Sequence, residues 1–209
     1  MVDLKGIKNI IFDYGGVIIN IDFKLSINAF KKLGFINVED CIFKSKGSYL
    51  LLKMEKGEIS GNDFRNEIRK IANLKLTDHQ IDFAWNALLL DMPIKRIKLL
   101  EKLKTNYRIF LLSNTNSIHY NKYLKDLQNN FGYSDFNKLF DKAWFSFQIK
   151  MVKPDSEIFK YALSAASILP NETLFIDDSI TNIEIAKEIG IKTYYLNKED
   201  IINAFKNYK

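Results

Sequence analysis

Short apolar runs recur along the chain, and most of them end on a polar residue. The clear runs lie at 10–12, 107–112, 173–176 and 193–196, and a weaker one lies at 144–146. The first is made of β-branched and aromatic residues without alternating polar positions, which is typical of a strand buried on both faces. The pattern predicts five short strands.

Helical spacing fills the stretches between the later strands. Apolar residues recur every three or four positions over 94–103 and 158–165, and helices are also predicted over 180–188, up to about residue 131 and from about Glu199. Strands that alternate with helices in this way form a parallel sheet with right-handed crossovers.

The stretch from 22 to 91 differs because helical spacing covers it without a convincing strand. One helix begins near Phe23, another covers 41–52, and two more follow Ser60 and Thr77, which have the residue type of helix N-caps. We therefore predict an α/β fold: a doubly wound, Rossmann-like core of residues 1–21 and 92–209 with an inserted all-helical cap domain of residues 22–91.

Composition and charge limit the kinds of molecule that we expect the protein to bind. The 209 residues carry a net charge of +6, but the lysines are scattered among acidic residues, so a solvated surface is favoured over a nucleic-acid site. A single cysteine, Cys41, excludes an internal disulfide and fits a reducing cytosol. Without a signal-peptide pattern or a membrane-length apolar stretch, we expect a cytoplasmic monomer or homodimer that binds neither membrane nor nucleic acid.

The first strand ends on an acid. Asp13 follows it directly, and Gly15 and Gly16 come next. Open α/β sheets bind ligands at the carboxyl ends of their strands, and glycine lets the backbone approach a ligand closely. By itself the stretch fits a strand end followed by a turn equally well.

Polar residues also follow the later strands. Ser113 and Asn114 end the second strand, Lys153 lies in a later loop, and Asp177 and Asp178 end the fourth strand. Each has a simpler explanation as a helix cap, a surface turn or a solvated charge. However, adjacent acids repel each other and a cation would relieve the repulsion. Their order on successive parallel strands favours a shared site.

These stretches resemble the four motifs of the haloacid dehalogenase-like hydrolase superfamily, namely residues 12–17, 112–114, 153–154 and 175–178. Residues 12–23, 55–60, 112–116 and 153–154 are similar to the bacterial branch that dephosphorylates α-D-glucose 1-phosphate. The resemblance implies a Mg²⁺-dependent phosphatase for a small phosphorylated metabolite, a sugar phosphate such as glucose 1-phosphate.

The resemblance also implies a role for each residue. Asp13 would attack phosphorus and form an aspartyl-phosphate, and Lys153 would balance its charge and that of the phosphate. Mg²⁺ would be held by Asp13, the Gly15 carbonyl and Asp178, with Asp177 as a supporting acid of the metal site. Substrate phosphoryl oxygens would contact Ser113, Asn114 and Lys153.

One position departs from the superfamily pattern. Its phosphatases usually carry a second aspartate two residues after the nucleophile, as general acid and base, and here that residue is Gly15. Asp22, Glu55 and His119 are conceivable replacements, although a helix cap, a solvated turn residue and a partly exposed helix residue are their simpler roles. Trp85 is a candidate substrate contact or a core residue.

The departure leaves two other functions open. One is a metal-independent 2-haloacid dehalogenase, against which the retained Asp177–Asp178 pair argues. The other is a catalytically weak member that acts as a binding or regulatory module.

Overall fold

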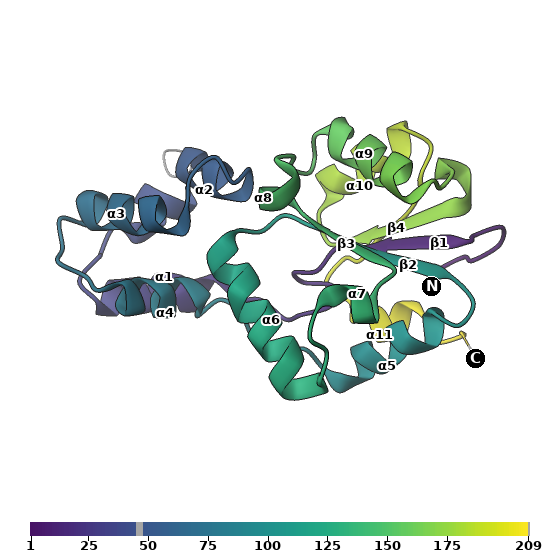
Figure 1. Ribbon diagram of the computed structural model, residues 1–209, viewed down its shortest axis with the longest axis horizontal. Coiled ribbons are helices and arrows are strands. Elements are labelled where there is room, and N and C mark those ends of the chain that lie inside the picture. Colours follow the sequence, from purple (N-terminus) through teal and green to yellow (C-terminus); the bar gives the residue numbers. More distant parts are fainter. Residues whose placement is uncertain (45–47, 209) are drawn as a thin grey trace.

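The computed structural model describes residues 1–44 and 48–208, and this part of the chain contains one five-stranded parallel sheet (Figure 1). The strands are β1 (Asn9–Phe12), β2 (Arg108–Ser113), β3 (Lys142–Phe145), β4 (Thr173–Asp177) and β5 (Lys192–Tyr195). Their order is β3-β2-β1-β4-β5, and each neighbouring pair is parallel. The central strand β1 therefore stands where the strand order reverses, which is the ligand-binding position of such sheets.

Helices cover both faces of the sheet, which confirms the predicted doubly wound core. The core helices are α5 (Ile94–Leu103), α6 (Ser117–Phe131), α7 (Phe136–Leu139), α8 (Ser146–Ile149), α9 (Ser156–Ala166), α10 (Ile180–Glu188) and α11 (Ile201–Ala204), with a 3₁₀ turn η2 (Pro170–Glu172). Helices α5, α7 and α11 cover one face, and α9 and α10 cover the other (Figure 1). Along β1, Ile10 and Phe12 point into the first apolar core and Ile11 into the second.

Strand boundaries shift by one or two residues from those expected. The weak third strand begins at Lys142 rather than Trp144, because the ladder pairs Phe110 with Lys142. It stops before Ser146, which starts α8 and whose hydroxyl bonds the backbone N–H and carbonyl of Thr115 at 2.9 and 3.0 Å.

The inserted region is helical, as predicted, and packs around an apolar core of its own. Its elements are α1 (Phe23–Lys32), a π-helical turn η1 (Glu39–Phe43), α2 (Ser48–Glu55), α3 (Gly61–Ala72) and α4 (Asp78–Asn86). The expected single helix over 41–52 is wrong at its start, where η1 stands, and residues 45–47 lie outside the described part. Phe30, Phe64 and Trp85 are central to the apolar core that these helices share.

Polar residues begin three of these helices at the predicted places. The Asp22 carboxylate accepts a hydrogen bond from the Lys24 N–H at 2.9 Å, which confirms the cap role expected of it. Ser60 and Thr77 each form a capping box, in which the cap side chain and the third helical residue bond each other's backbone. The two connections to the core run side by side, since Asp22 N–H donates to the Leu88 carbonyl at 2.9 Å.

Within the described residues, we find no helix whose length and hydropathy would let it cross a membrane.

Candidate active site

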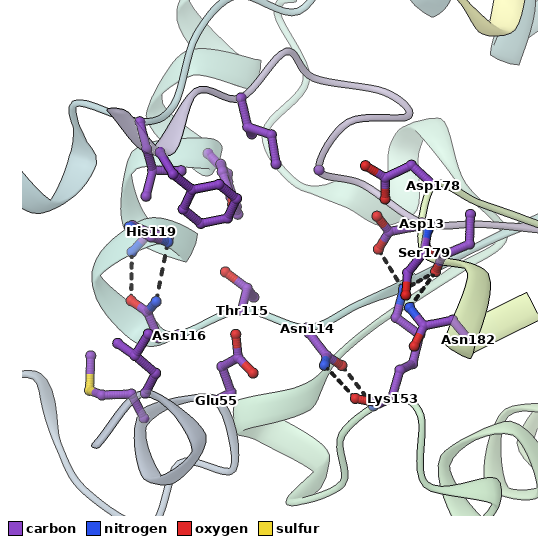
Figure 2. A pocket seen from close by; sticks show the side chains of 18 of the residues that line it. Asp13, Glu55, Asn114, Thr115, Asn116, His119, Lys153, Asp178, Ser179 and Asn182 are labelled. Carbon is purple, nitrogen blue, oxygen red and sulfur yellow. Dashed lines mark hydrogen bonds and ion pairs between the residues drawn. The ribbon is translucent and has the colours of Figure 1, made fainter. Parts of the chain in front are cut away.

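A cavity of about 270 Å³ lies between the carboxyl ends of the central strands and the helical cap (Figure 2). Its core wall includes Asp13, Asn114, Lys153 and Asp178, and its cap wall includes Met54, Glu55 and Trp85. The predicted acids and lysine therefore meet at one edge of the sheet, although up to 165 residues separate them in the sequence.

Lys153 holds two carboxylates together at the centre of this wall. Its Nζ donates to Asp13 Oδ1 at 2.6 Å and to Asp177 Oδ2 at 2.7 Å, and all three side chains are largely buried. Burial lowers the pKa of the Lys153 ammonium, but the two carboxylates more than offset it, so the net shift is upward. Lys153 is therefore a permanent cation that orients Asp13.

The two adjacent acids after β4 have different surroundings. Asp177 accepts hydrogen bonds from Lys153 Nζ, from Asn182 Nδ2 at 2.9 Å and from Ser179 N–H at 2.8 Å. Asp178 is exposed and lies against Gly16, where a Cβ atom would be 2.2 Å from Asp178 Oδ2. Only glycine allows that approach, and Gly16 has a φ of +74°.

The carboxylates suit a hard divalent cation. Oxygen atoms of Asp13, Asp177 and Asp178 lie within 4.8 Å of one another, and oxygen ligands are those that Mg²⁺ prefers. Burial raises the pKa of Asp13 to about 7, although Lys153 lowers it, and burial and Asp177 raise the pKa of Asp178. A bound cation would stabilise the charged forms. Because its oxygens already accept three hydrogen bonds, Asp177 fits a supporting role at the metal site. Gly15, whose carbonyl is the further predicted ligand, lines the same cavity.

Ser113 and Asn114, the two residues predicted to bind phosphate, have different surroundings. Asn114 Nδ2 donates to the Lys153 carbonyl at 2.8 Å, and Lys153 N–H donates to Asn114 Oδ1 at 2.9 Å, so this amide fixes the lysine loop (Figure 2). Ser113 is buried and lies outside the cavity lining, and within residues 1–44 and 48–208 its hydroxyl makes one contact, at 3.5 Å with the Asn114 carbonyl. Contact of either residue with a phosphoryl group stays a prediction.

His119 is buried, so its expected partial exposure is wrong. Its ring stacks on Trp85 at a centroid distance of 4.8 Å, and its two nitrogens bond the Asn116 amide and the Trp85 carbonyl, each at 3.2 Å. Burial lowers the pKa of His119 to about 4, so the ring is neutral at physiological pH. Trp85 belongs to the apolar core of the cap and also lines the cavity.

Glu55 corrects a second expectation, because it is not a solvated turn residue. It is the last residue of α2, it is partly buried, and its carboxyl points into the cavity (Figure 2). Burial raises the pKa of Glu55 to about 7, although the positive charge of Lys153 lowers it.

Sequence reasoning also missed several lining residues, chief among them Thr115, Tyr123 and Asn182. Thr115 directly follows the Ser113–Asn114 pair, so its position was a usable signal. Tyr123 and Asn182 reach the cavity from helices α6 and α10, and no motif marked either of them.

Comparisons with known proteins show which family this chain resembles. The family model of haloacid dehalogenase-like hydrolases matches residues 7–190. The D-ribitol-5-phosphate phosphatase of Bacteroides thetaiotaomicron is 32% identical over 188 residues, which are 90% of this chain and 91% of that protein.

Solved structures give the same result. A haloacid dehalogenase-family enzyme of B. thetaiotaomicron, crystallised with magnesium and inorganic phosphate, has a TM-score of 0.87 at 43% identity and covers 95% of this chain and 99% of that chain. An L-2-haloacid dehalogenase of Xanthobacter autotrophicus shows the shared fold alone, with a TM-score of 0.61 at 17% identity over 97% of this chain and 84% of that chain. With its family model matched over most of its length, the protein belongs to the haloacid dehalogenase-like hydrolases.

Proposed function

We propose that the protein is a Mg²⁺-dependent phosphatase that hydrolyses a small phosphate monoester through an aspartyl-phosphate on Asp13. The observation that carries the proposal is the buried Asp13 carboxylate, held 2.6 Å from Lys153 Nζ within a cluster of three acids. Support comes from relatives named as a phosphatase and crystallised with magnesium and phosphate.

The residues divide the phosphoryl chemistry between them. Asp13 Oδ attacks phosphorus, the bond from phosphorus to the ester oxygen breaks, and an acyl phosphate forms on Asp13. Water then attacks that phosphorus, releases inorganic phosphate and restores the carboxylate. Lys153 orients Asp13 and balances the negative charge on both partners. Asp13, Asp178 and the Gly15 carbonyl would hold Mg²⁺, which when bound offsets the charge of the phosphoryl group.

The organic part of the substrate would lie against the cap. We propose a sugar or sugar-alcohol phosphate, with glucose 1-phosphate and ribitol 5-phosphate as the first compounds to test. The cavity volume of about 270 Å³ admits one small organic group, and its lining includes the apolar Trp85 and the polar Glu55 of the cap and Thr115 of the core.

The test is a phosphate-release screen over these esters, with Mg²⁺ and with EDTA. We expect release to require Mg²⁺ and to vanish in Asp13→Asn, and equal release from both proteins would contradict the proposal. A parallel halide assay with 2-chloropropionate in EDTA tests the dehalogenase alternative, for which the acidic cluster has no use.

A further inference from the structure

The proposed reaction needs a proton donor that the strand end does not supply. When the bond from phosphorus to an alkyl ester oxygen breaks, the departing alkoxide is strongly basic and must receive a proton. Gly15, two residues after the nucleophile, has no side chain that could donate one. The donor must therefore come from elsewhere in the cavity wall.

Most titratable groups that line the cavity have other roles. Lys153 donates to Asp13 and Asp177, and Asp177 accepts three hydrogen bonds. His119 is neutral, and both ring nitrogens are bonded. Burial raises the pKa of Tyr123 far above neutrality, so its proton is held too tightly for this task. Among the described lining residues, one carboxyl outside the metal cluster remains, that of Glu55.

The position of Glu55 is determined by contacts between the cap and the core. Two residues further on, Gly57 has a φ of +57°, and a Cβ atom there would lie 2.3 Å from the Phe147 carbonyl oxygen. Lys150 Nζ donates to the Gly57 carbonyl, and Lys56 Nζ lies 4.0 Å from an Asp155 oxygen. The turn after α2 is thus docked on α8, which holds Glu55 over the carboxyl edge of the sheet.

A buried hydroxyl lines the same cavity as Glu55. Thr115 is 2% exposed and lines the cavity together with Tyr123, and a hydrogen bond from Thr115 slightly offsets the effect of burial on the pKa of the Tyr123 phenol. Figure 2 shows the Glu55 carboxyl pointing into the cavity, whose lining also includes Asn114, Thr115 and Asn116.

We propose that Glu55 is the acid–base residue of the enzyme and acts on the leaving group from the cap side. The inference rests on the proposed phosphatase function. In the first step the Glu55 carboxylic acid gives its proton to the ester oxygen as the bond to phosphorus breaks, which releases a neutral alcohol. In the second step the Glu55 carboxylate takes a proton from water as the water oxygen attacks the aspartyl-phosphate. Phosphate leaves, Asp13 is restored, and Glu55 is again protonated.

The electrostatic surroundings support both halves of the cycle. Burial raises the pKa of Glu55 to about 7, and Lys153 is the charged group that opposes the shift. Tyr123 and His119 face the same cavity in their neutral forms. A carboxyl with a pKa near the working pH is populated in both its acid and base forms, which suits general acid–base catalysis.

The experiment compares Glu55→Gln with Glu58→Gln, an exposed glutamate three residues away that does not line the cavity. Two substrates are used: D-ribitol 5-phosphate, or glucose 1-phosphate if the wild type hydrolyses it faster, and p-nitrophenyl phosphate, whose leaving group needs no proton. We expect Glu55→Gln to lower kcat on the alkyl phosphate by about 10²–10³-fold. On p-nitrophenyl phosphate it should give a burst of about one nitrophenol per enzyme and then slow turnover. Glu58→Gln should match the wild type.

Three outcomes would overturn the inference: unchanged kcat in Glu55→Gln, a rise in KM alone, or an equal loss on both substrates without a burst. The burst also reports a folded protein with a working nucleophile, so misfolding cannot imitate the expected result. Glu55→Asp, which keeps a carboxyl, should recover part of the lost kcat. If Asp13→Asn releases phosphate as fast as the wild type, the proposed function fails as well; a loss confined to Asp13→Asn overturns the role of Glu55 alone.

Discussion

The core wall and the cap wall of the cavity are held in place by different kinds of contact. On the core side, Lys153 pairs with two buried carboxylates, and Asn114 bonds its backbone in both directions. On the cap side, Glu55 depends on a turn that touches the core through Gly57. Phosphoryl chemistry is thus built into the sheet edge, whereas proton transfer is carried by a docked turn. Changes to the two walls should have separable effects.

The largest effect should come from the nucleophile. Asp13→Asn removes the attacking carboxylate and keeps its shape, so we expect kcat to fall by about 10⁴–10⁶-fold. Phosphate release and phosphate trapped on the protein after acid quench measure the two steps. Asp3→Asn, an exposed aspartate before β1, is the control. Trapped phosphate on Asp13→Asn would contradict this assignment.

Removal of the lysine should cost stability as well as activity. Lys153→Met leaves Asp13 and Asp177 buried without their cation, and breaking a buried pair from one side costs about 3–5 kcal/mol. Lys160→Met is the control, because Lys160 pairs with Glu157 at the same 2.7 Å but on the surface, where a pair contributes about 1 kcal/mol or less. Denaturant unfolding in EDTA gives both values, and equal losses would contradict the comparison.

The same contrast explains which residues of the site could be predicted from the sequence and which could not. Asp13, Lys153 and the Asp177–Asp178 pair follow directly from strand ends or their loops, and parallel strands bring such ends to one edge whatever the details of packing. Glu55 and His119 were misjudged because their burial depends on how the cap packs on the core. No periodicity within α2 or α6 reports that the α2 turn docks against α8 or that Trp85 covers His119.

The docked turn can be tested without touching a titratable group. Gly57→Ala places a Cβ against the Phe147 carbonyl, whereas Gly132→Ala has a similar φ of +77° with no atom within 4 Å. Both should lose about 1–2 kcal/mol of stability from the left-handed backbone. Only Gly57→Ala should displace Glu55 and lower kcat on the alkyl phosphate, by about 10–10²-fold, while the nitrophenol burst remains. Equal kinetics in the two variants would show that the turn does not position Glu55.

Burial of Glu55 should also leave a signature in stability against pH. Its pKa rises from 4.5 to about 7 on folding, so the folded state holds the proton more tightly and stability falls as pH rises through that window. Glu55→Gln lacks this loss. Its Tm relative to that of the wild type should therefore be higher at pH 8 than at pH 5, by roughly 2–4 °C for each kcal/mol of unfolding free energy that the wild type loses over this range. Glu58→Gln, at an exposed glutamate outside the cavity, is the control. A constant difference between wild type and Glu55→Gln would contradict the burial of this carboxyl.

The smallest effect, and the closest test of the comparison, is to move the acid from one wall to the other. A Cβ at Gly15 would meet the Ile21 side chain at 3.4 Å, so the backbone there accepts a side chain, and Gly15 lines the cavity. In the Glu55→Gln background, Gly15→Asp should raise kcat on the alkyl phosphate by about three- to tenfold, well short of full recovery, because the new acid lacks the setting that tunes Glu55. Gly15→Ala in the same background controls for the added carbon. Equal rates for Asp and Ala at this position would mean that a proton donor on the core wall cannot reach the leaving group, and that the cap wall alone serves it.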